Sequence, residues 1–417
     1  MFFYNLGIYA FQLGVKIASV INPKAMLWVK GRKRWKQQLI QSVNSFGLKN
    51  AVWLHCASLG EFEQGRPVIE KIKRDFPHQK VILTFFSPSG YEIQKNYPLA
   101  DLVMYLPVDT PYNAYHFINI LEPKMAIFVK YEFWLNYLSA LKKKSVPTFL
   151  ISTVIKKHQT FFKWYGSSFR KALKTYHTIF TQDVYSLRLL KLLNIGTGVL
   201  AGDTRFDRVL KIGSSPKSIS EIERFSENAF VVIAGSSWQK DEEYLIETYA
   251  ALKSKHPSLK LIIAPHEIDK NNIDRLKNLL HKHQVRFHLF SDNLSSYTHS
   301  VLVLNAIGFL SSVYQYGTVA IIGGGFNNGI HNVLEPTVYG LPVMFGPNFQ
   351  KFNEAHELIE LKAATVFSDS NELTHQLHYY MSDEIELRTA SALAKNYVLK
   401  KSGATDKIAT ILEKFIV

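Results

Sequence analysis

From residue 51 onward, short runs of β-branched and aromatic residues alternate with stretches whose apolar positions recur at helical spacing. The first series of runs predicts strands at residues 51–57, 81–86, 102–106, 125–129 and 148–151, with helices at 65–76 and 112–121 between them. A second series predicts strands at residues 230–234, 259–264, 301–304, 319–322 and 342–345, each followed by a helical pattern. This alternation predicts two α/β domains, each with a mainly parallel sheet covered by helices.

The boundary between the domains is expected at residues 211–220, which are small, polar and contain proline. A chain of 417 residues is long enough for two cores. The predicted domains are residues 48–210 and 221–400. Residues 384–414 have a helical pattern, so the C-terminal helix at 401–417 could return to the first domain.

The N-terminal segment, residues 1–36, combines an apolar helix with a basic cluster. Asn5, Gln12, Lys16 and Ser19 interrupt the apolar residues, and at 100° per residue they fall within a wedge of about 60°. The result is a broad apolar face, which favours a membrane surface or a membrane-spanning position, with a buried core helix as the alternative. Basic residues and tryptophans follow directly, as is typical of a cytoplasmic membrane surface.

The charge distribution supports a basic surface. The net charge is +15, residues 1–60 hold eight Lys and Arg and no acid, and residues 133–182 hold nine and no acid. Such a surface attracts anionic lipid headgroups, nucleic acid or a phosphorylated substrate. The single cysteine, Cys56, excludes an internal disulfide and metal sites built from cysteine clusters.

Charged residues follow two predicted strands of the first domain and stand in the turn that closes it. Glu61 comes after the first strand, where a helix N-terminus favours an ionised carboxylate that can accept a proton. Glu132 follows the 125–129 strand, at the same end of what we expect to be a neighbouring strand. Arg205 lies in a charged turn that closes the domain. Taken singly, a residue in such a position is more often part of a structural salt bridge or a complement to a helix dipole.

The second domain carries small residues at its strand ends. Residues 234–238 form a turn that can hold a phosphate on backbone N–H groups. Gly323, Gly324 and Gly325 permit close approach of a ligand to the backbone, and Asn332 suits the N-cap of a following helix. These motifs contain no acidic metal-binding pair, so we expect metal-independent chemistry.

Together these motifs resemble one family, the 3-deoxy-D-manno-octulosonic acid (Kdo) transferases of lipopolysaccharide synthesis. The resemblance runs from the N-terminal helix to about residue 400 and is carried by residues 58–61, 132–134, 331–336, 340–343 and 346–348. It implies a GT-B fold of two Rossmann-like domains with an intervening cleft, plus a membrane-associating N-terminal helix. It also implies an inverting, metal-independent transferase without a cofactor, which uses CMP-Kdo and acts on the anionic lipid A precursor (lipid IVA) at the cytoplasmic face of the inner membrane.

Carried over by position, the family's general base falls on Glu61 and its assisting residues on Glu132 and Arg205. The donor-binding positions fall on Pro265, His266, Ile307, Gly308, Phe309, Asn332, Val333, Leu334 and Glu335.

This sequence departs from the family's pattern in three places. Arg205 replaces the usual lysine, His266 stands where an arginine is usual, and residues 305–309 lack two usual acids. Side-chain contacts to the donor are therefore expected to differ there.

Two alternative functions remain, a GT-B enzyme that uses a UDP-sugar and a non-enzymatic basic protein that binds membranes or polyanions. The ordered strand-end motifs favour an enzyme and give no reason to expect a nucleic-acid partner.

Overall fold

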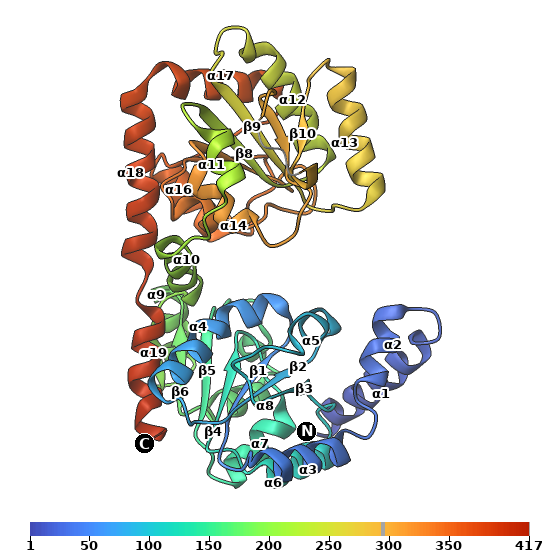
Figure 1. Cartoon of the computed structure of the whole chain (residues 1–417). Coiled ribbons are helices and arrows are strands. Elements are labelled where there is room, and N and C mark those ends of the chain that lie inside the picture. Colours follow the sequence, from blue (N-terminus) through green and yellow to red (C-terminus); the bar gives the residue numbers. More distant parts are fainter. Residues whose placement is uncertain (293–296, 417) are drawn as a thin grey trace. The chain divides into compact units, whose positions relative to one another are not determined.

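The chain folds into two compact units with separate cores. The computed structural model describes residues 1–292 and 297–416 (Figure 1). Unit 1 holds residues 1–207 and the described residues from Ser402 onward, and unit 2 holds residues 208–401. The chain therefore passes between the units twice, and both termini belong to unit 1.

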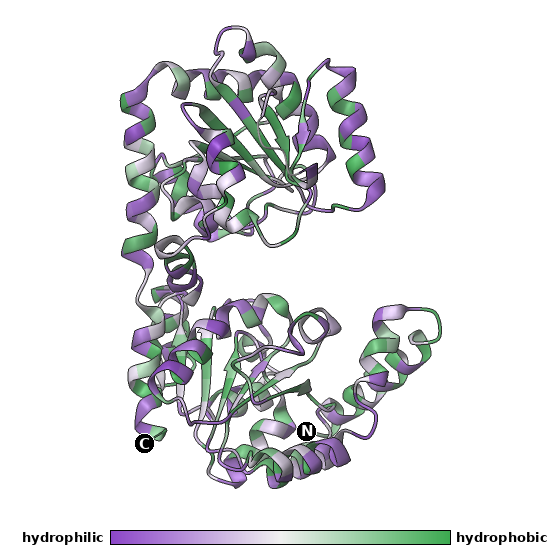
Figure 2. Cartoon of the chain, in the orientation of Figure 1, coloured by the Kyte–Doolittle hydropathy of each residue, from purple (hydrophilic) through white to green (hydrophobic). Residues whose placement is uncertain are grey.

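Unit 1 is built on a parallel sheet of seven strands in the order β3-β2-β1-β4-β5-β6-β7. The strands are β1 Val52–Cys56, β2 Val81–Phe85, β3 Leu102–Tyr105, β4 Met125–Val129, β5 Thr148–Thr153, β6 Thr178–Thr181 and β7 Gly198–Leu200. Side chains alternate between the two faces, so Trp53 packs into one core and Leu54 into the other. Because both faces are covered, the central strands read as continuous apolar runs (Figure 2).

The helices of unit 1 complete these two cores. They are α1 Phe2–Ala18, α2 Pro23–Lys30, α3 Trp35–Phe46, α4 Leu59–Asp75, α5 Pro88–Gln94, α6 Pro111–Leu121, α7 Leu135–Lys143, η1 Thr160–Phe162, α8 Ser167–Leu173, α9 Val184–Leu192, α19 Ala404–Leu412 and η4 Glu413–Phe415. Helix α10, Thr204–Ser214, begins in unit 1 and continues into unit 2.

Unit 2 repeats the architecture with a parallel sheet in the order β10-β11-β9-β8-β12-β13-β14. Its strands are β8 Phe230–Ser237, β9 Leu259–Pro265, β10 His288–Leu289, β11 Val301–Val303, β12 Val319–Ile322, β13 Val343–Phe345 and β14 Ala364–Val366. Its helices are α11 Ser220–Ser226, α12 Gln239–Lys253, α13 Lys270–Lys282, η2 Phe290–Asp292, α14 Leu310–Val313, η3 Tyr314–Tyr316, α15 Leu334–Thr337, α16 Asn353–Glu360, α17 Ser370–Ser382 and α18 Glu384–Lys401.

Each sheet has one point at which the strand order reverses. In unit 1 the chain builds outward from β1 through β2 and β3, then crosses to β4 on the other side. In unit 2 the corresponding neighbours are β8 and β12. Loops on either side of such a point diverge, which leaves a crevice at the carboxyl ends of the two strands where ligands of open α/β sheets bind.

The predicted α/β class with two parallel sheets is confirmed, but the expected linker at residues 211–220 is partly wrong. Residues 211–214 belong to α10, because the apolar spacing of the preceding segment continues into them. The passage out of unit 1 lies at residues 207 and 208, inside this helix. The sequence pattern predicted an interdomain linker at residues 211–220, whereas residues 211–214 form the last turn of α10.

The C-terminal segment packs in unit 1, where α19 lies against α4. Asp207 Oδ1 accepts the backbone N–H of Gly403 at 2.5 Å, and Oδ2 accepts the backbone N–H and the hydroxyl of Thr405, each at 2.7 Å. These are the free donors of a helix N-terminus, and a carboxylate stabilises them through hydrogen bonds and through the helix dipole. Asp207 therefore anchors α19.

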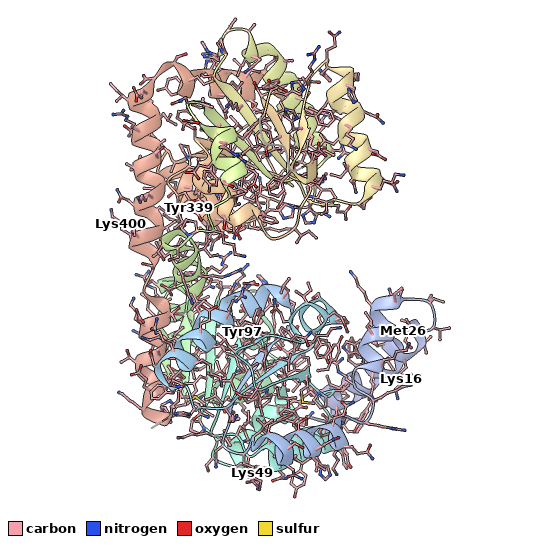
Figure 3. All side chains as sticks on the ribbon, in the orientation of Figure 1. Lys16, Met26, Lys49, Tyr97, Tyr339 and Lys400 are labelled. Atoms are coloured by element: carbon pink, nitrogen blue, oxygen red, sulfur yellow. The ribbon has the colours of Figure 1, made fainter. Side chains whose placement is uncertain are left out.

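Helix α1 leaves most of its apolar residues exposed and contacts the rest of unit 1 through Tyr4, Asn5 and Phe11. Phe3 is 84% and Ile17 is 67% exposed, whereas Asn5 is half-buried and accepts a hydrogen bond from Asn136 Nδ2 at 2.9 Å. Beside it the Tyr4 hydroxyl donates to Asp109 Oδ2 at 2.6 Å. Figure 3 marks the α1–α2 hairpin by Lys16 and Met26. None of the helices in the described ranges meets the length and hydropathy needed to cross a bilayer.

Candidate functional site

The carboxyl ends of β1 and β4 bring Glu61 into a polar cluster in unit 1. Glu61 stands in the first turn of α4, where Ser58 precedes the helix and donates its hydroxyl to Glu61 Oε2. Lys130 follows β4, and its Nζ lies 3.7 Å from Glu61 Oε1. The side chain of Glu61 keeps 19% of its exposure, so solvent still reaches the carboxylate. Since β1 and β4 flank the reversal point of the sheet, this carboxylate lies where the fold favours ligand binding.

The backbone at Lys130 is in an uncommon conformation. Its φ is 66°, in the left-handed region that non-glycine residues rarely occupy. Such residues cost roughly 1–3 kcal/mol and cluster at active sites and ligand clamps. The turn directs the chain from β4 into the segment that carries Glu132.

Glu132 is buried beside the end of β1, the strand that precedes Glu61. Its side chain is 9% exposed, and Oε2 accepts the indole N–H of Trp134 and lies 3.3 Å from His55 Nε2. Its backbone carbonyl accepts the hydroxyl of Tyr176. A buried carboxylate needs such partners to remain charged without a large desolvation cost. Glu132 is therefore held by groups from β1, the 130–134 segment and the residues before β6.

His55 and Cys56 are the last residues of β1 and have different roles. His55 is fully buried, and its Nδ1 lies 2.9 Å from Thr84 Oγ1 of β2, which orients the ring so that Nε2 faces Glu132. Burial raises the pKa of the Cys56 thiol well above its usual range, and the nearby carboxylates of Glu61 and Glu132 raise it further. The thiol therefore stays protonated and is not a nucleophile at neutral pH.

Arg205 follows β7 at the sheet edge, yet its segment returns to α4. Thr204 Oγ1 donates to the backbone carbonyl of Gln64 at 2.6 Å, one helical turn beyond Glu61. Arg205 Nε and Nη2 donate to Asp203 Oδ2 at 2.9 and 2.7 Å, so the guanidinium is held in a fixed direction. The structure thus places Glu61, Glu132 and the Arg205 segment around the amino-terminal end of α4.

In unit 2, the carboxyl ends of β8, β9 and β12 assemble a stack of three aromatic rings. The ring of His266 stacks on both Trp238 and His331, with ring centroids 4.7 and 4.4 Å away and interplanar angles of 25° and 27°. The rings of Trp238 and His331 are nearly parallel, at 10°, with their centroids 6.5 Å apart. The indole N–H of Trp238 also donates to His331 Nε2 at 3.0 Å. Burial and the neighbouring His266 lower the pKa of His331 to about 4, so its imidazole is neutral at physiological pH.

The three glycines after β12 have a structural cause, because the loop packs closely against neighbouring backbone. A Cβ at Gly323 would lie 2.1 Å from the carbonyl oxygen of Ser236, and one at Gly325 would lie 2.5 Å from the amide of Gly346. Gly324 has a φ of 91°. The glycines therefore allow the loop to pack against neighbouring strand-end backbone, and their presence is explained without a ligand.

Asp241 ties this loop to the β8 turn. Its Oδ2 accepts the backbone N–H groups of Trp238 and Gly324, both at 2.9 Å. Burial raises the pKa of Asp241 to about 6, with the neighbouring Glu242 adding to the shift. The carboxylate fixes the two loops on either side of the β8–β12 reversal point.

The remaining predicted donor positions occupy two loops and the end of a strand in unit 2. Asn332 Oδ1 accepts the backbone N–H of Leu334 at 3.0 Å, and its Nδ2 donates to Glu335 Oε1 at 3.1 Å. The N-cap residue of α15 is Val333, so the expected N-cap at Asn332 is wrong by one position. That helix has only four residues, and the expected strong helix dipole is therefore reduced to one turn. Pro265, Val333 and Leu334 are buried; Ile307 is 83% exposed beside Gly308 and Phe309.

Several residues of these clusters were not among the predicted site residues: His55, Lys130, Trp134, Tyr176, Trp238, Asp241 and His331. The sequence held one indication of a functional position for three of them, since His55, Lys130 and Trp238 stand at or next to the end of a strand. Tyr176 and His331 have no such signal, because their contacts depend on how distant loops pack.

Solved structures define the class of fold. A UDP-GlcNAc 2-epimerase from Neisseria meningitidis matches with a TM-score of 0.60 at 14% identity, over 87% of this chain and 100% of that one. A glycosyltransferase from Rickettsia africae matches with a TM-score of 0.57 at 13% identity, over 88% and 99%. The protein is thus an α/β protein with two parallel sheets, similar to the GT-B glycosyltransferases.

Sequence relatives narrow this class to a family. The model of the 3-deoxy-D-manno-octulosonic-acid transferases matches residues 33–208. The 3-deoxy-D-manno-octulosonic acid transferase of Aquifex aeolicus is 29% identical over 359 residues, which are 85% of this chain and 93% of the relative. That of Haemophilus influenzae is 23% identical over 403 residues, 92% of each chain. The chain is thus similar along most of its length to the Kdo transferases, a glycosyltransferase family of lipopolysaccharide biosynthesis.

Proposed function

We propose that the protein transfers Kdo from CMP-Kdo to the lipid A precursor, a phosphorylated glucosamine disaccharide lipid, with inversion and with Glu61 as the general base. The observation that carries this proposal is the position of Glu61. Its carboxylate lies at the reversal point of the unit 1 sheet, contacts Ser58 and Lys130, and remains open to solvent. A base must reach the hydroxyl from which it takes a proton, and a partly exposed carboxylate at a ligand-binding strand end meets that need.

In the proposed step, the acceptor hydroxyl oxygen attacks the anomeric carbon of Kdo. The new C–O bond forms as the bond from that carbon to the phosphate oxygen of CMP breaks. The hydroxyl proton passes to Glu61, and the electron pair of the broken bond leaves on the phosphate. The developing phosphate charge is what the donor site must stabilise, since only interactions that strengthen in the transition state raise the rate.

Glu132 and Arg205 assist indirectly in this proposal. Glu132 is buried and its Oε2 faces Trp134 and His55, so its charge organises the β1 and β4 ends rather than taking the acceptor proton. Arg205 retains a guanidinium held by Asp203 and supplies positive charge for a phosphorylated substrate.

Unit 2 is proposed to hold CMP-Kdo at the β8–β12 reversal point and the loops beside it. The residues proposed for donor contact are Pro265, His266, Ile307, Gly308, Phe309, Asn332, Val333, Leu334 and Glu335. Gly308 has a φ of 87° and no heavy atom within 4 Å of a Cβ built there, so this loop is open to a ligand. We further propose that transfer needs neither a metal ion nor a cofactor.

The N-terminal hairpin is proposed to dock the protein on the cytoplasmic face of the inner membrane. Its support is the orientation of α1, most of whose apolar residues are exposed while Asn5 and Tyr4 bond to unit 1. A second acid-free stretch, residues 133–182, includes Trp164, which is 90% exposed, and Tyr165, which is 58% exposed. Basic residues with exposed aromatic rings suit an anionic lipid surface.

The test is a reconstituted transfer assay with purified full-length protein. CMP-Kdo and a tetraacylated, bis-phosphorylated glucosamine disaccharide are supplied, and the lipid product is analysed by mass. The wild type should add Kdo, whereas Glu61→Gln, which keeps the size of the side chain but cannot accept the proton as a carboxylate, should lose at least about 100-fold in kcat. Full turnover by Glu61→Gln would refute the assigned base, and thermal protection by UDP but not by CMP would refute the donor.

A further inference from the structure

The stack of Trp238, His266 and His331 in unit 2 contains two imidazoles in contact. Their ring centroids are 4.4 Å apart, which is too close for both rings to carry a positive charge without mutual repulsion. If the pair takes up one proton, the environment of each ring must decide which one holds it. The hydrogen bonds of the stack answer this question.

His331 is the ring that stays neutral. The indole N–H of Trp238 can only donate, and it points at His331 Nε2 at 3.0 Å. That nitrogen must therefore keep its lone pair, and the proton of the neutral ring lies on Nδ1. Protonation of Nε2 would break the hydrogen bond and place two donors face to face. The lowered pKa of His331, caused by burial and by His266, agrees with this geometry.

His266 is the ring that can accept the charge. It is exposed, and it stacks on the indole of Trp238 at 4.7 Å, an arrangement that stabilises a cation over an electron-rich ring. It directly follows β9, next to the β8–β12 reversal point, so a charge on it would face the crevice where a ligand of unit 2 is expected.

The backbone holds the three rings in place. His266 N–H donates to the Ser237 carbonyl at 2.9 Å, and His331 N–H donates to the Gly323 carbonyl at 3.1 Å. Asp241 bonds the amides of Trp238 and Gly324. The three segments that carry these rings are therefore hydrogen-bonded to one another, which holds the rings in their stacked arrangement before a ligand binds.

We propose that His266 is the protonation-dependent cation that recognises the phosphate of the nucleotide, and that Trp238 is a positioning residue that forces the proton onto His266 by occupying His331 Nε2. This inference rests on the proposed function, because it names how unit 2 recognises a nucleoside monophosphate group. An imidazole changes charge between about pH 5 and 8, unlike a guanidinium, which stays charged. Nucleotide affinity should therefore fall as the pH rises through this range.

Other ionisable groups on the same segments must be separated from this effect. Asp241 is the important one, because its pKa of about 6 lies in the same range and its ionisation also disfavours an anion. The phosphate monoester of free CMP, which is the probe used below, also titrates near pH 6. Other charged groups on the three segments have partners. Glu242 pairs with Arg275, Lys240 pairs with Glu243, Glu267 and Asp269 accept from Asn272, and Glu335 accepts from Asn332.

The experiment compares CMP binding by calorimetry at pH 6.0 and 8.0 for the wild type and His266→Arg. The arginine keeps a positive charge at both pH values, while Asp241 and the CMP phosphate titrate identically in both proteins. The ratio of the two dissociation constants, wild type over variant, should rise about tenfold from pH 6 to pH 8. A constant ratio would overturn the proposal. Absence of CMP binding by both proteins at either pH would instead refute the proposed nucleotide function.

A second measurement tests the role of Trp238 directly. Nitrogen-15 NMR of histidine-labelled wild type should show His331 as the neutral Nδ1–H tautomer from pH 6 to 8, assigned by its loss in His331→Gln. Trp238→Phe keeps a ring for stacking but has no N–H, so His331 should titrate at higher pH in this variant. A His331 resonance that is already protonated at pH 6 in the wild type, or one that Trp238→Phe leaves unchanged, would contradict the assignment.

Discussion

Replacement of Trp134 by phenylalanine isolates the hydrogen bond that holds the buried carboxylate of Glu132. The phenyl ring keeps an aromatic contact with Phe86, whose ring centroid lies 4.9 Å away, but loses the N–H that donates to Glu132 Oε2. The carboxylate is only 9% exposed, so water replaces the lost donor poorly. Hydrogen bonds to charged groups contribute about 1.5–3 kcal/mol, and we expect the free energy of unfolding of unit 1 to fall by about that amount.

A double-mutant cycle with Glu132→Gln separates the hydrogen bond from the loss of ring volume. Because each unit has its own core, unfolding of unit 1 is followed by hydrogen exchange of the β1 and β4 amides in urea. The coupling energy between Trp134→Phe and Glu132→Gln should be about 1–3 kcal/mol. Trp164→Phe is the matched control, since Trp164 is 90% exposed, and it should change stability by less than about 0.5 kcal/mol. A coupling energy near zero would refute the argument that this contact secures Glu132.

Three further changes have expected outcomes. Asp207→Ala removes an acceptor of three hydrogen bonds and should destabilise α19 by about 2–4 kcal/mol, seen as faster hydrogen exchange of residues 404–412, while exchange in the α12 segment of unit 2 stays unchanged. Gly323→Ala places a Cβ 2.1 Å from a backbone oxygen and should lower the melting temperature of unit 2, whereas Gly196→Ala in unit 1, where a Cβ meets no atom within 4 Å, should leave the melting temperature of unit 1 unchanged. Asp241 has its pKa raised to about 6 from 3.8, so the folded state holds the proton more tightly than the unfolded chain, and stability from this group is present at low pH and lost as the pH rises. The wild type should therefore lose up to about 3 kcal/mol relative to Asp241→Asn between pH 4 and 6, and equal pH profiles of the two proteins in urea unfolding would exclude this role.

Much of the fold was predictable because its strands are buried on both faces. Continuous apolar runs identified β1, β4 and β12 nearly residue for residue, since helices cover both sides of each sheet. Strands β7, β10 and β14 were missed because they are two or three residues long at sheet edges or carry polar residues. Strand β6 is flanked by threonines that weaken its apolar pattern.

The candidate site was predictable in part, and the reason differs between the units. Glu61 and Glu132 follow two apolar runs, and their strands prove to be neighbours at the reversal point of the sheet. In unit 2 the glycine loop was predicted to permit close approach of a ligand, and the structure shows that Gly323 and Gly325 also lie close to the backbone of Ser236 and Gly346. The sequence does not show why a position needs glycine, because glycine is needed both where backbone segments pack closely and where a ligand approaches the backbone.

The sequence by itself determined the alternation of strands and helices, the amphipathic N-terminal helix and the ends of the strands where charged residues stand. These properties depend on residues within a few positions of one another, which is why local periodicity reveals them. Only the tertiary structure decided the strand order and the partners of distant side chains. Trp238 and His331 are 93 positions apart, and their hydrogen bond exists because β8 and β12 pair in the sheet and bring their loops together. No local pattern encodes that pairing, so the chemistry of the stack became visible only in three dimensions.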